Sequence, residues 1–221
     1  MPDVRSDFSQ SAVLTPQCHE WIPSPEAGVE RVMLDRVGDE VAVATSLVRY
    51  AAGSRFPDHD HALGEEYIVL AGEFGDEHGR YCAGTYVRNP PGTHHAPFSD
   101  PGCVIFVKLR QFHLEDQRQC VIRLEASVPD GGWSAKELHR YADEVVREIV
   151  AAADVEVVLP AAPYVQEMLV LEGRILWEGR ELAANGWIRV PAGSALTVIT
   201  RKPSRLFSKT RPIYRDPIKK P

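Results

Sequence analysis

Apolar residues occur along this chain in short runs that turn-forming residues separate. The runs are rich in Val, Ile, Leu and Tyr, and clusters of Gly, Pro, Asn and Asp lie between them. A strand and turn in every 8–12 residues or so is typical of an all-β sandwich or barrel. We predict strands at Val41–Tyr50, Tyr67–Leu70, Thr85–Val87, Val104–Leu109, Val155–Leu159, Met168–Leu171, Trp187–Val190 and Leu196–Thr200.

One segment departs from this pattern. Residues 134–150 (SAKELHRYADEVVREIV) begin with charged residues that favour helices and end with apolar residues. Lys, Glu and Leu have high helix propensity, so we predict a turn or two of helix in this segment.

The pattern repeats within the chain. Its two halves align without gaps at an offset of 101 residues, so that residues 68–74 (IVLAGEF) lie over residues 169–175 (LVLEGRI). The same register superimposes the Pro-x-Gly turns of the two halves. We infer a duplicated β-domain, because chance rarely preserves turn residues and apolar runs together in one register. We expect two domains, residues 1–115 and 116–221, with their junction within residues 112–133.

Composition and charge narrow the expected cellular location and the expected partners of the protein. The first residues lack the basic start and apolar run of a signal peptide, and no window approaches the roughly 18 apolar residues of a membrane span. The four cysteines are far apart and form no short disulfide framework. We therefore expect a cytoplasmic protein without a membrane partner. The net charge of −6 also argues against nucleic acid as a partner.

The end of the chain has the opposite charge. From Arg201 onward it carries eight basic residues against Asp216 as its one acidic residue. A solvated surface tail and a docking site for an acidic partner both fit this composition, so the sequence leaves the role of the segment open.

Candidate metal ligands gather in the first copy. His59 and His61 are two residues apart, so on an extended strand both side chains point to the same face. Glu65 has the same parity, and His95 follows a turn at residues 90–92 that can bring its strand alongside the first. Three imidazoles and one carboxylate suit Zn²⁺, Fe²⁺, Mn²⁺, Ni²⁺ or Cu²⁺.

These residues lie in a larger pattern. The spacing G-x5-H-x-H-x3-E-x6-G over residues 53–72, and G-x5-P-x-G-x2-H over residues 84–95, resembles the two motifs of the cupin superfamily. The resemblance implies a double-stranded β-helix barrel with a metal inside it, and the duplication implies a bicupin. Residues 59–112 are similar to the cupin domain of the ChrR family of anti-sigma factors, in which the corresponding site binds zinc.

The resemblance implies a cofactor and a ligand. We expect one divalent transition metal in the first barrel, zinc first, with iron, manganese or nickel as alternatives. We also expect a small-molecule ligand in that barrel, and a homodimer through exposed barrel edges. The expected metal ligands are His59, His61, Glu65 and His95.

The ChrR resemblance also raises the question of a sigma-factor partner, which in that family is held by a separate N-terminal zinc-binding domain. Only Cys18 and His19 precede the first barrel as candidate ligands for such a domain, and these are too few to build it. We therefore do not expect a sigma-factor partner.

Three functions stay open at this point. The chain is a regulatory, stress-sensing metal protein of the anti-sigma-factor-like kind, a non-haem metal-dependent dioxygenase that acts on a small ketone or phenolic substrate, or a storage or structural bicupin without chemistry. The sequence does not decide whether the chain is an enzyme, and it assigns no catalytic residue.

The second copy lacks these ligands. We expect its barrel to hold no metal, because none of the four residues at the offset of 101 would bind one. Glu66 has the opposite parity to Glu65, and both Glu66 and Arg88 keep their counterparts in the second copy. We therefore predict that Glu66 pairs with Arg88 on the outer face of the barrel. The four residues that replace the ligands are Pro160, Ala162, Gln166 and Leu196.

Overall fold

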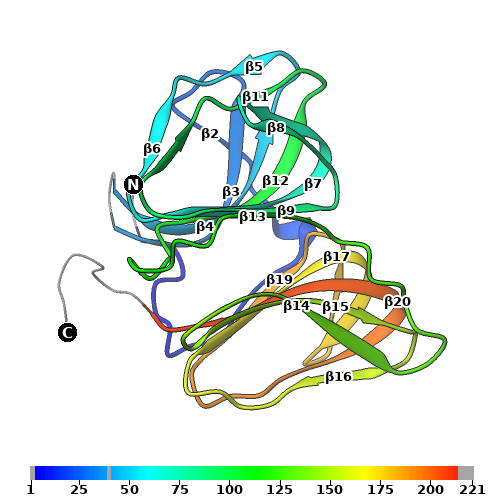
Figure 1. The fold of residues 1–221 in the computed structure, drawn as a ribbon. Helices are drawn as coiled ribbons and strands as arrows, with labels where there is room; N and C mark the ends of the chain where they lie inside the picture. Colours follow the sequence, from blue (N-terminus) through cyan, green and yellow to red (C-terminus); the bar gives the residue numbers. More distant parts are fainter. Residues whose placement is uncertain (1–2, 39–40, 214–221) are drawn as a thin grey trace. The chain divides into compact units, whose positions relative to one another are not determined.

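A computed structural model describes residues 3–38 and 41–213, and nearly all of its regular elements are β-strands (Figure 1). These residues form two compact units, one containing Glu20–Leu124 and the other containing Asp7–His19 and Glu125–Ile213. The predicted all-β architecture with two barrels is confirmed. In the described part of the chain no helix is long and apolar enough to cross a membrane.

The first unit consists of a large sheet in the order β13-β9-β7-β12-β4-β3-β2, together with short strands that pair as β6 with β10 and β5 with β11. Strand β8 pairs with β7. The strands are β2 (Ile22–Pro23), β3 (Val29–Val37), β4 (Val43–Tyr50), β5 (Ser54–Arg55), β6 (His59–His61), β7 (Glu65–Asp76), β8 (Gly79–Cys82), β9 (Thr85–Asn89), β10 (Thr93–His95), β11 (Phe98–Ser99), β12 (Cys103–Leu109) and β13 (Cys120–Arg123).

The second unit has the order β1-β19-β17-β20-β15-β14, with β16 on β20 and β18 on β17. All eight predicted strands are found in the two units. The elements of this unit are β1 (Ala12–Leu14), the short 3-10 helix η1 (Pro16–Cys18), β14 (Trp133–Tyr141), β15 (Glu144–Ala151), β16 (Glu156–Leu159), β17 (Val165–Trp177), β18 (Arg180–Ala183), β19 (Trp187–Val190) and β20 (Leu196–Arg211).

The helix predicted within residues 134–150 is wrong. This segment forms the antiparallel hairpin β14–β15, and Ala142 in its turn has a φ of 46°. Strand β15 also pairs with β20 along its length, and its apolar residues are mostly β-branched and buried. Pairing on both sides and a preference for pleated, buried surfaces outweigh the helix propensity of the charged residues.

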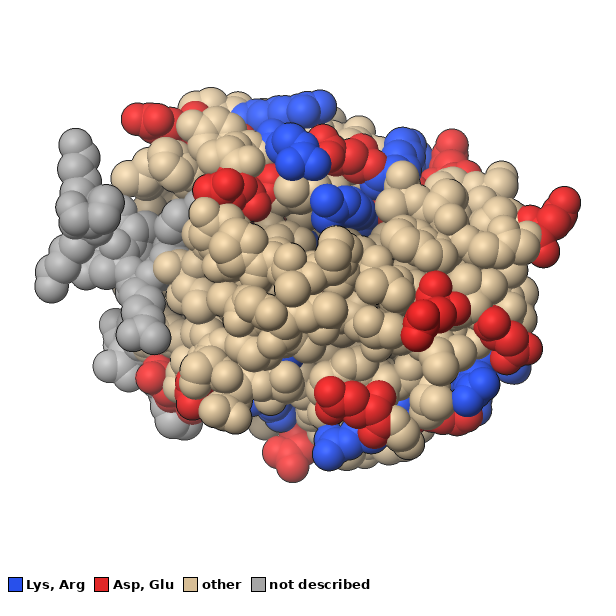
Figure 2. Space-filling view, turned by 90° about the horizontal axis from the view of Figure 1, so that it is seen from below, with Lys and Arg blue, Asp and Glu red and all other residues tan. Residues whose placement is uncertain are grey.

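The basic segment after Arg201 is only partly a tail. Residues 201–211 belong to β20, where Lys209 is buried and its Nζ lies 3.1 Å from Glu144 Oε1. Residues 214–221, which carry the rest of the charge, lie outside the described residues. On the described residues of the face in Figure 2, basic and acidic side chains are interspersed around a broad uncharged area.

The duplication is visible in backbone hydrogen bonds. Gly92 N donates to His61 O over 3.0 Å in the first unit, and Gly193 N donates to Ala162 O over 2.7 Å in the second. Gly92 and Gly193 have φ values of 87° and 81°, which favour glycine. The offset of 101 residues therefore superimposes the same turn geometry in the two units.

The pair between Glu66 and Arg88 is present but buried. Their side chains are 1% and 0% exposed, and Arg88 Nη1 lies 2.9 Å from Glu66 Oε2. The Arg88 guanidinium is also 4.1 Å from the Phe112 ring centre and 2.6 Å from Asp116 Oδ2. The segment that follows β12 therefore covers the predicted outer-face pair, which the alternation of residues on a strand could not indicate.

In the second unit, residues from the start of the chain cover the corresponding arginine. Strand β1 pairs with β19, as β13 pairs with β9 in the first unit. The guanidinium of Arg189 lies 4.1 Å from the ring centre of Phe8, as Arg88 lies over Phe112. Residues 7–19 therefore belong to the second unit, although they precede the first barrel in sequence.

Candidate metal centre

The histidines come together through one pair of short strands. Strands β6 and β10 are antiparallel, with His95 opposite His59 and Thr93 opposite His61. Because side chains alternate along a strand, these four share one face, whereas His94 points to the other. His94 is exposed, and its Nδ1 lies 3.0 Å from Asp58 Oδ1.

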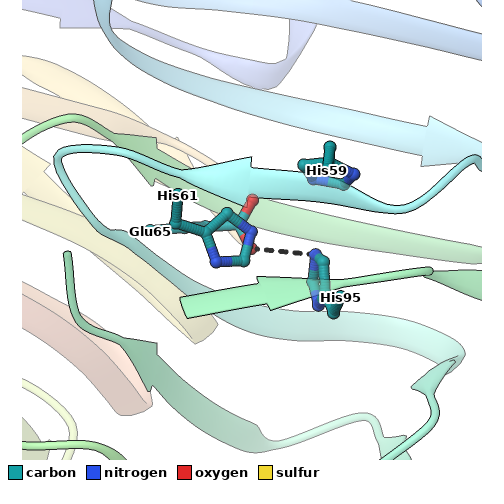
Figure 3. Close-up of side chains that lie close together, drawn as sticks. All are labelled: His59, His61, Glu65 and His95. Atoms are coloured by element: carbon teal, nitrogen blue, oxygen red, sulfur yellow. Dashed lines mark ion pairs between the residues drawn. The ribbon is translucent and has the colours of Figure 1, made fainter. Parts of the chain in front are cut away.

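Glu65 reaches the same point from the start of β7. The turn before it closes with a hydrogen bond of 3.1 Å from Gly64 N to His61 O. Glu65 Oε2 then lies 3.4 Å from His61 Nε2 and 3.5 Å from His95 Nε2 (Figure 3). All four predicted residues offer a ligand atom within 4.8 Å of one another, and we call them the His–Glu cluster.

Hydrogen bonds orient two of the imidazoles. The Thr93 hydroxyl donates to Pro90 O over 2.8 Å, so it accepts a hydrogen bond from His61 Nδ1 at 3.0 Å. The carboxylate of Asp76 accepts one from His95 Nδ1, with Oδ2 at 3.2 Å. Each ring then carries its proton on Nδ1 and has a lone pair on Nε2, the arrangement that metal-binding histidines use.

The third imidazole, that of His59, lies at the exposed edge of the cluster and also carries its proton on Nδ1. His59 Nδ1 lies 3.2 Å from Pro57 O, which can only accept, and this leaves His59 Nε2 with a lone pair. The centres of the three rings are 4.5–5.2 Å apart. The structure thus gathers three nitrogen lone pairs and a carboxylate, and these residues fit a divalent transition metal.

Three atoms of the cluster are buried and have no hydrogen-bond partner, namely His61 Nε2, Glu65 Oε2 and His95 Nε2. Buried polar atoms are rarely left unsatisfied, because each one costs free energy. All three are acceptors when the rings are neutral, so they cannot satisfy one another. A bound cation would satisfy all of them at once.

The pKa values of the two buried imidazoles shift in opposite directions. Burial lowers the pKa of His61, although the charge of Glu65 acts in the opposite direction. Burial would also lower the pKa of His95, but the hydrogen bond that it donates to Asp76 and the charges of Glu65 and Asp76 raise it overall. The same carboxylates that favour a proton on His95 would favour a metal cation in its place.

The cluster borders a cavity of about 690 Å³ in the first unit, and His59, His61 and Glu65 form part of its wall. This volume lies within the range of about 300–1,000 Å³ that is usual for small-molecule sites. The rest of the wall is largely apolar, with Val48, Val107 and other side chains from the large sheet. A small molecule in this cavity would therefore have access to the cluster.

Sequence reasoning missed two residues that orient the cluster. Thr93 lies two residues before His95 and shares its parity, so the alternation of the strand could have indicated it. Asp76 lies at the far end of β7, and nothing in its spacing marks it as a neighbour of His95. Ser99 donates to Glu73 O over 2.6 Å and lies outside the cluster.

The arrangement of two barrels with a His–Glu cluster in one of them defines a bicupin. Residues 9–113 match the family of ChrR cupin-like domains, and most of this range forms the first barrel, which is a ChrR-like cupin domain. No curated protein resembles the chain closely enough in sequence to count as a relative.

Several solved structures share the fold at low sequence identity. A putative dioxygenase from Nostoc punctiforme has a TM-score of 0.69 at 14% identity, covering 97% of this chain and 84% of its own. A bacterial pirin from Escherichia coli, in complex with nickel(II), has a TM-score of 0.69 at 15% identity, covering 92% and 100%. A salicylate 1,2-dioxygenase from Pseudaminobacter salicylatoxidans has a TM-score of 0.59 at 10% identity, covering 88% and 76%.

Proposed function

We propose that the first barrel holds one divalent transition metal on the His–Glu cluster, and that this metal takes part in binding a small molecule in the adjoining cavity. The observation that carries the proposal is the convergence of three buried acceptor atoms, on His61, Glu65 and His95, without a hydrogen-bond donor. When bound, the metal would act as a Lewis acid toward an oxygen atom of the ligand.

The position of the cavity beside the cluster helps to decide which metal ion suits the site. Four protein ligands saturate tetrahedral zinc, whereas an octahedral ion such as iron, manganese or nickel keeps two positions open. Contact of the cavity with His59, His61 and Glu65 favours an ion with open positions. The nickel(II) complex of the pirin with the same fold supports this choice.

The first test is the metal content of protein purified without added metal or chelator. We expect about one metal ion per chain in the wild type and below about a tenth of that in His61→Ala, which lacks a buried ligand. His94→Ala is the matched control, because His94 is exposed and faces away from the cluster. Equal loss in both variants would contradict the assignment of His95, and a metal-free wild type would contradict the proposal.

A regulatory role is the first candidate for such a centre. The match of residues 9–113 to ChrR cupin-like domains supports it. In this role the ligand would be bound and not converted.

Metal-dependent oxygenation of a small ketone or phenolic substrate is the second candidate. It is favoured by the space beside the cluster, and two proteins with the same fold are described as a putative dioxygenase and a salicylate dioxygenase. We expect iron-loaded protein to consume oxygen only with a substrate from a panel of small diketones and phenolic acids, and His61→Ala not to do so. Oxygen consumption is measured with an oxygen electrode. If no compound of the panel causes the protein to consume oxygen, the regulatory role is favoured.

A further inference from the structure

The cavity beside the His–Glu cluster has three arginines in its wall, and two of them, Arg31 and Arg36, lie on β3. Residues five apart on a regular strand point to opposite faces. The register of β3 against β4 shifts between Met33 and Asp35, however, and such a β-bulge reverses the alternation. Both guanidinium groups therefore point into the interior of the same barrel.

Arg31 has an incomplete set of partners. Its Nη2 donates to Ser24 Oγ, but its Nε is buried without a hydrogen-bond partner. Among the residues that the structure describes, no carboxylate lies within ion-pair distance of Arg31, whereas buried Arg88 pairs with two. A partly buried cation with a free donor is costly, and an anionic ligand would satisfy both its charge and its donor.

The surroundings of Arg31 disfavour its charge on balance. Burial lowers the pKa of its guanidinium and the nearby charge of Arg36 lowers it further, whereas Tyr50 acts in the opposite direction. Tyr50, which also lines the cavity, is within electrostatic reach of both Glu65 and Arg31. Arg31 and the cluster therefore act on one and the same cavity.

The sheet places the arginines and the cluster at different parts of the wall. Glu65 lies opposite Leu109, Leu109 opposite Ala44, and Ala44 opposite Arg36, so one row crosses four strands. Leu109 and Ala44 line the cavity between the two charged ends. A ligand that fills this row meets positive charge at one end, an apolar wall in the middle and the cluster at the other end.

We infer that this cavity binds a small organic carboxylate with an apolar body, whose carboxylate pairs with Arg31 and whose other end reaches the His–Glu cluster. The inference names the ligand class of the proposed metal centre and in that respect rests on the proposed function. Arg36 supplies a second positive charge to the same cavity.

The test measures binding of defined probes to the full chain by calorimetry at constant ionic strength. The probes are benzoate, phenylacetate and hexanoate, each compared with its neutral amide. We expect at least one carboxylate to bind saturably, at least about tenfold more tightly than its amide, because only the carboxylate pairs with a guanidinium. Arg31→Gln should weaken this binding at least about tenfold.

Three controls keep the result specific. Arg80→Gln removes an exposed arginine of the same unit that lies outside the cavity, and it should bind like the wild type. Arg31→Lys, which keeps the charge, should bind more tightly than Arg31→Gln. Circular dichroism and metal content are measured on every sample, and both should be unchanged in Arg31→Gln.

The outcomes separate this inference from the proposed metal centre. If none of the carboxylates binds, or if Arg31→Gln binds them like the wild type, the inference is overturned. The proposed metal centre would still stand in that case, provided that the wild type contains metal. If the wild type contains no metal but still binds a carboxylate in an Arg31-dependent way, the proposed centre fails and the inference holds.

Discussion

The interiors of the two barrels differ at the same four positions. In the first barrel they carry the His–Glu cluster beside a cavity of about 690 Å³. In the second, Leu196 replaces His95 and is 0% exposed within a continuous apolar core that includes Met168 and Val198. The first interior combines a polar cluster with a cavity whose wall is otherwise largely apolar, and the second is packed with apolar side chains.

Gln166 satisfies its polar atoms within the second barrel. It stands where the first barrel has Glu65, and its Nε2 donates to Pro160 O over 3.0 Å and to Ser194 O over 2.9 Å. The NH₂ group of a neutral amide thus donates two hydrogen bonds within the barrel, whereas the carboxylate of Glu65 has an oxygen without a hydrogen-bond partner. The turn at Gly92 and its counterpart at Gly193 keep the same backbone hydrogen bond, so this turn forms without the cluster.

The largest effect that would test this comparison is expected in the second barrel. Leu196→Ala should lower the free energy of unfolding of the second unit by about 2–5 kcal/mol, because it leaves a hole in a filled core. Chemical denaturation followed by hydrogen exchange would locate the loss in residues 156–211. The metal content of the first barrel should stay unchanged.

A matched change at the surface sets the baseline for this experiment. Val158→Ala alters β16 of the same unit at a side chain that is 38% exposed, so its cost should be within about 0.5 kcal/mol. A drop in metal content in Leu196→Ala would contradict the view that the second barrel is filled independently of the cluster.

A smaller effect is expected from the residue that orients His95. Asp76→Asn should weaken metal binding about 10-fold to 100-fold, because the amide is a poorer acceptor for His95 Nδ1–H and fixes its tautomer less well. Competition with a chromophoric chelator would measure the change in Kd. Unaltered affinity would show that the buried carboxylate is not needed to orient the ring.

The control for Asp76→Asn removes a neighbouring charge without touching the imidazole. Glu77→Gln keeps an oxygen that can accept from Ala96 N, a bond of 2.9 Å in the wild type. Its side chain is exposed, so we expect metal affinity to change less than about threefold.

The local spacing of residues in the sequence determined the positions of the candidate ligands and the duplication of the fold. The two-residue step from His59 to His61 gives both side chains one face, and the offset of 101 residues reveals the duplication and the lost ligands. Alternation along a strand and the conformational demands of turns depend on neighbouring residues only, so they can be read without a structure.

Only the tertiary structure decided the features that depend on a partner strand. The hairpin at residues 133–151 forms because β20 pairs with it, and Asp76 meets His95 because β7 extends to that point. The bulge in β3 turns Arg31 and Arg36 to the same cavity, and residues 7–19 join the second unit. The free energy of such contacts arises between segments far apart in the chain, so no local pattern of residues encodes them.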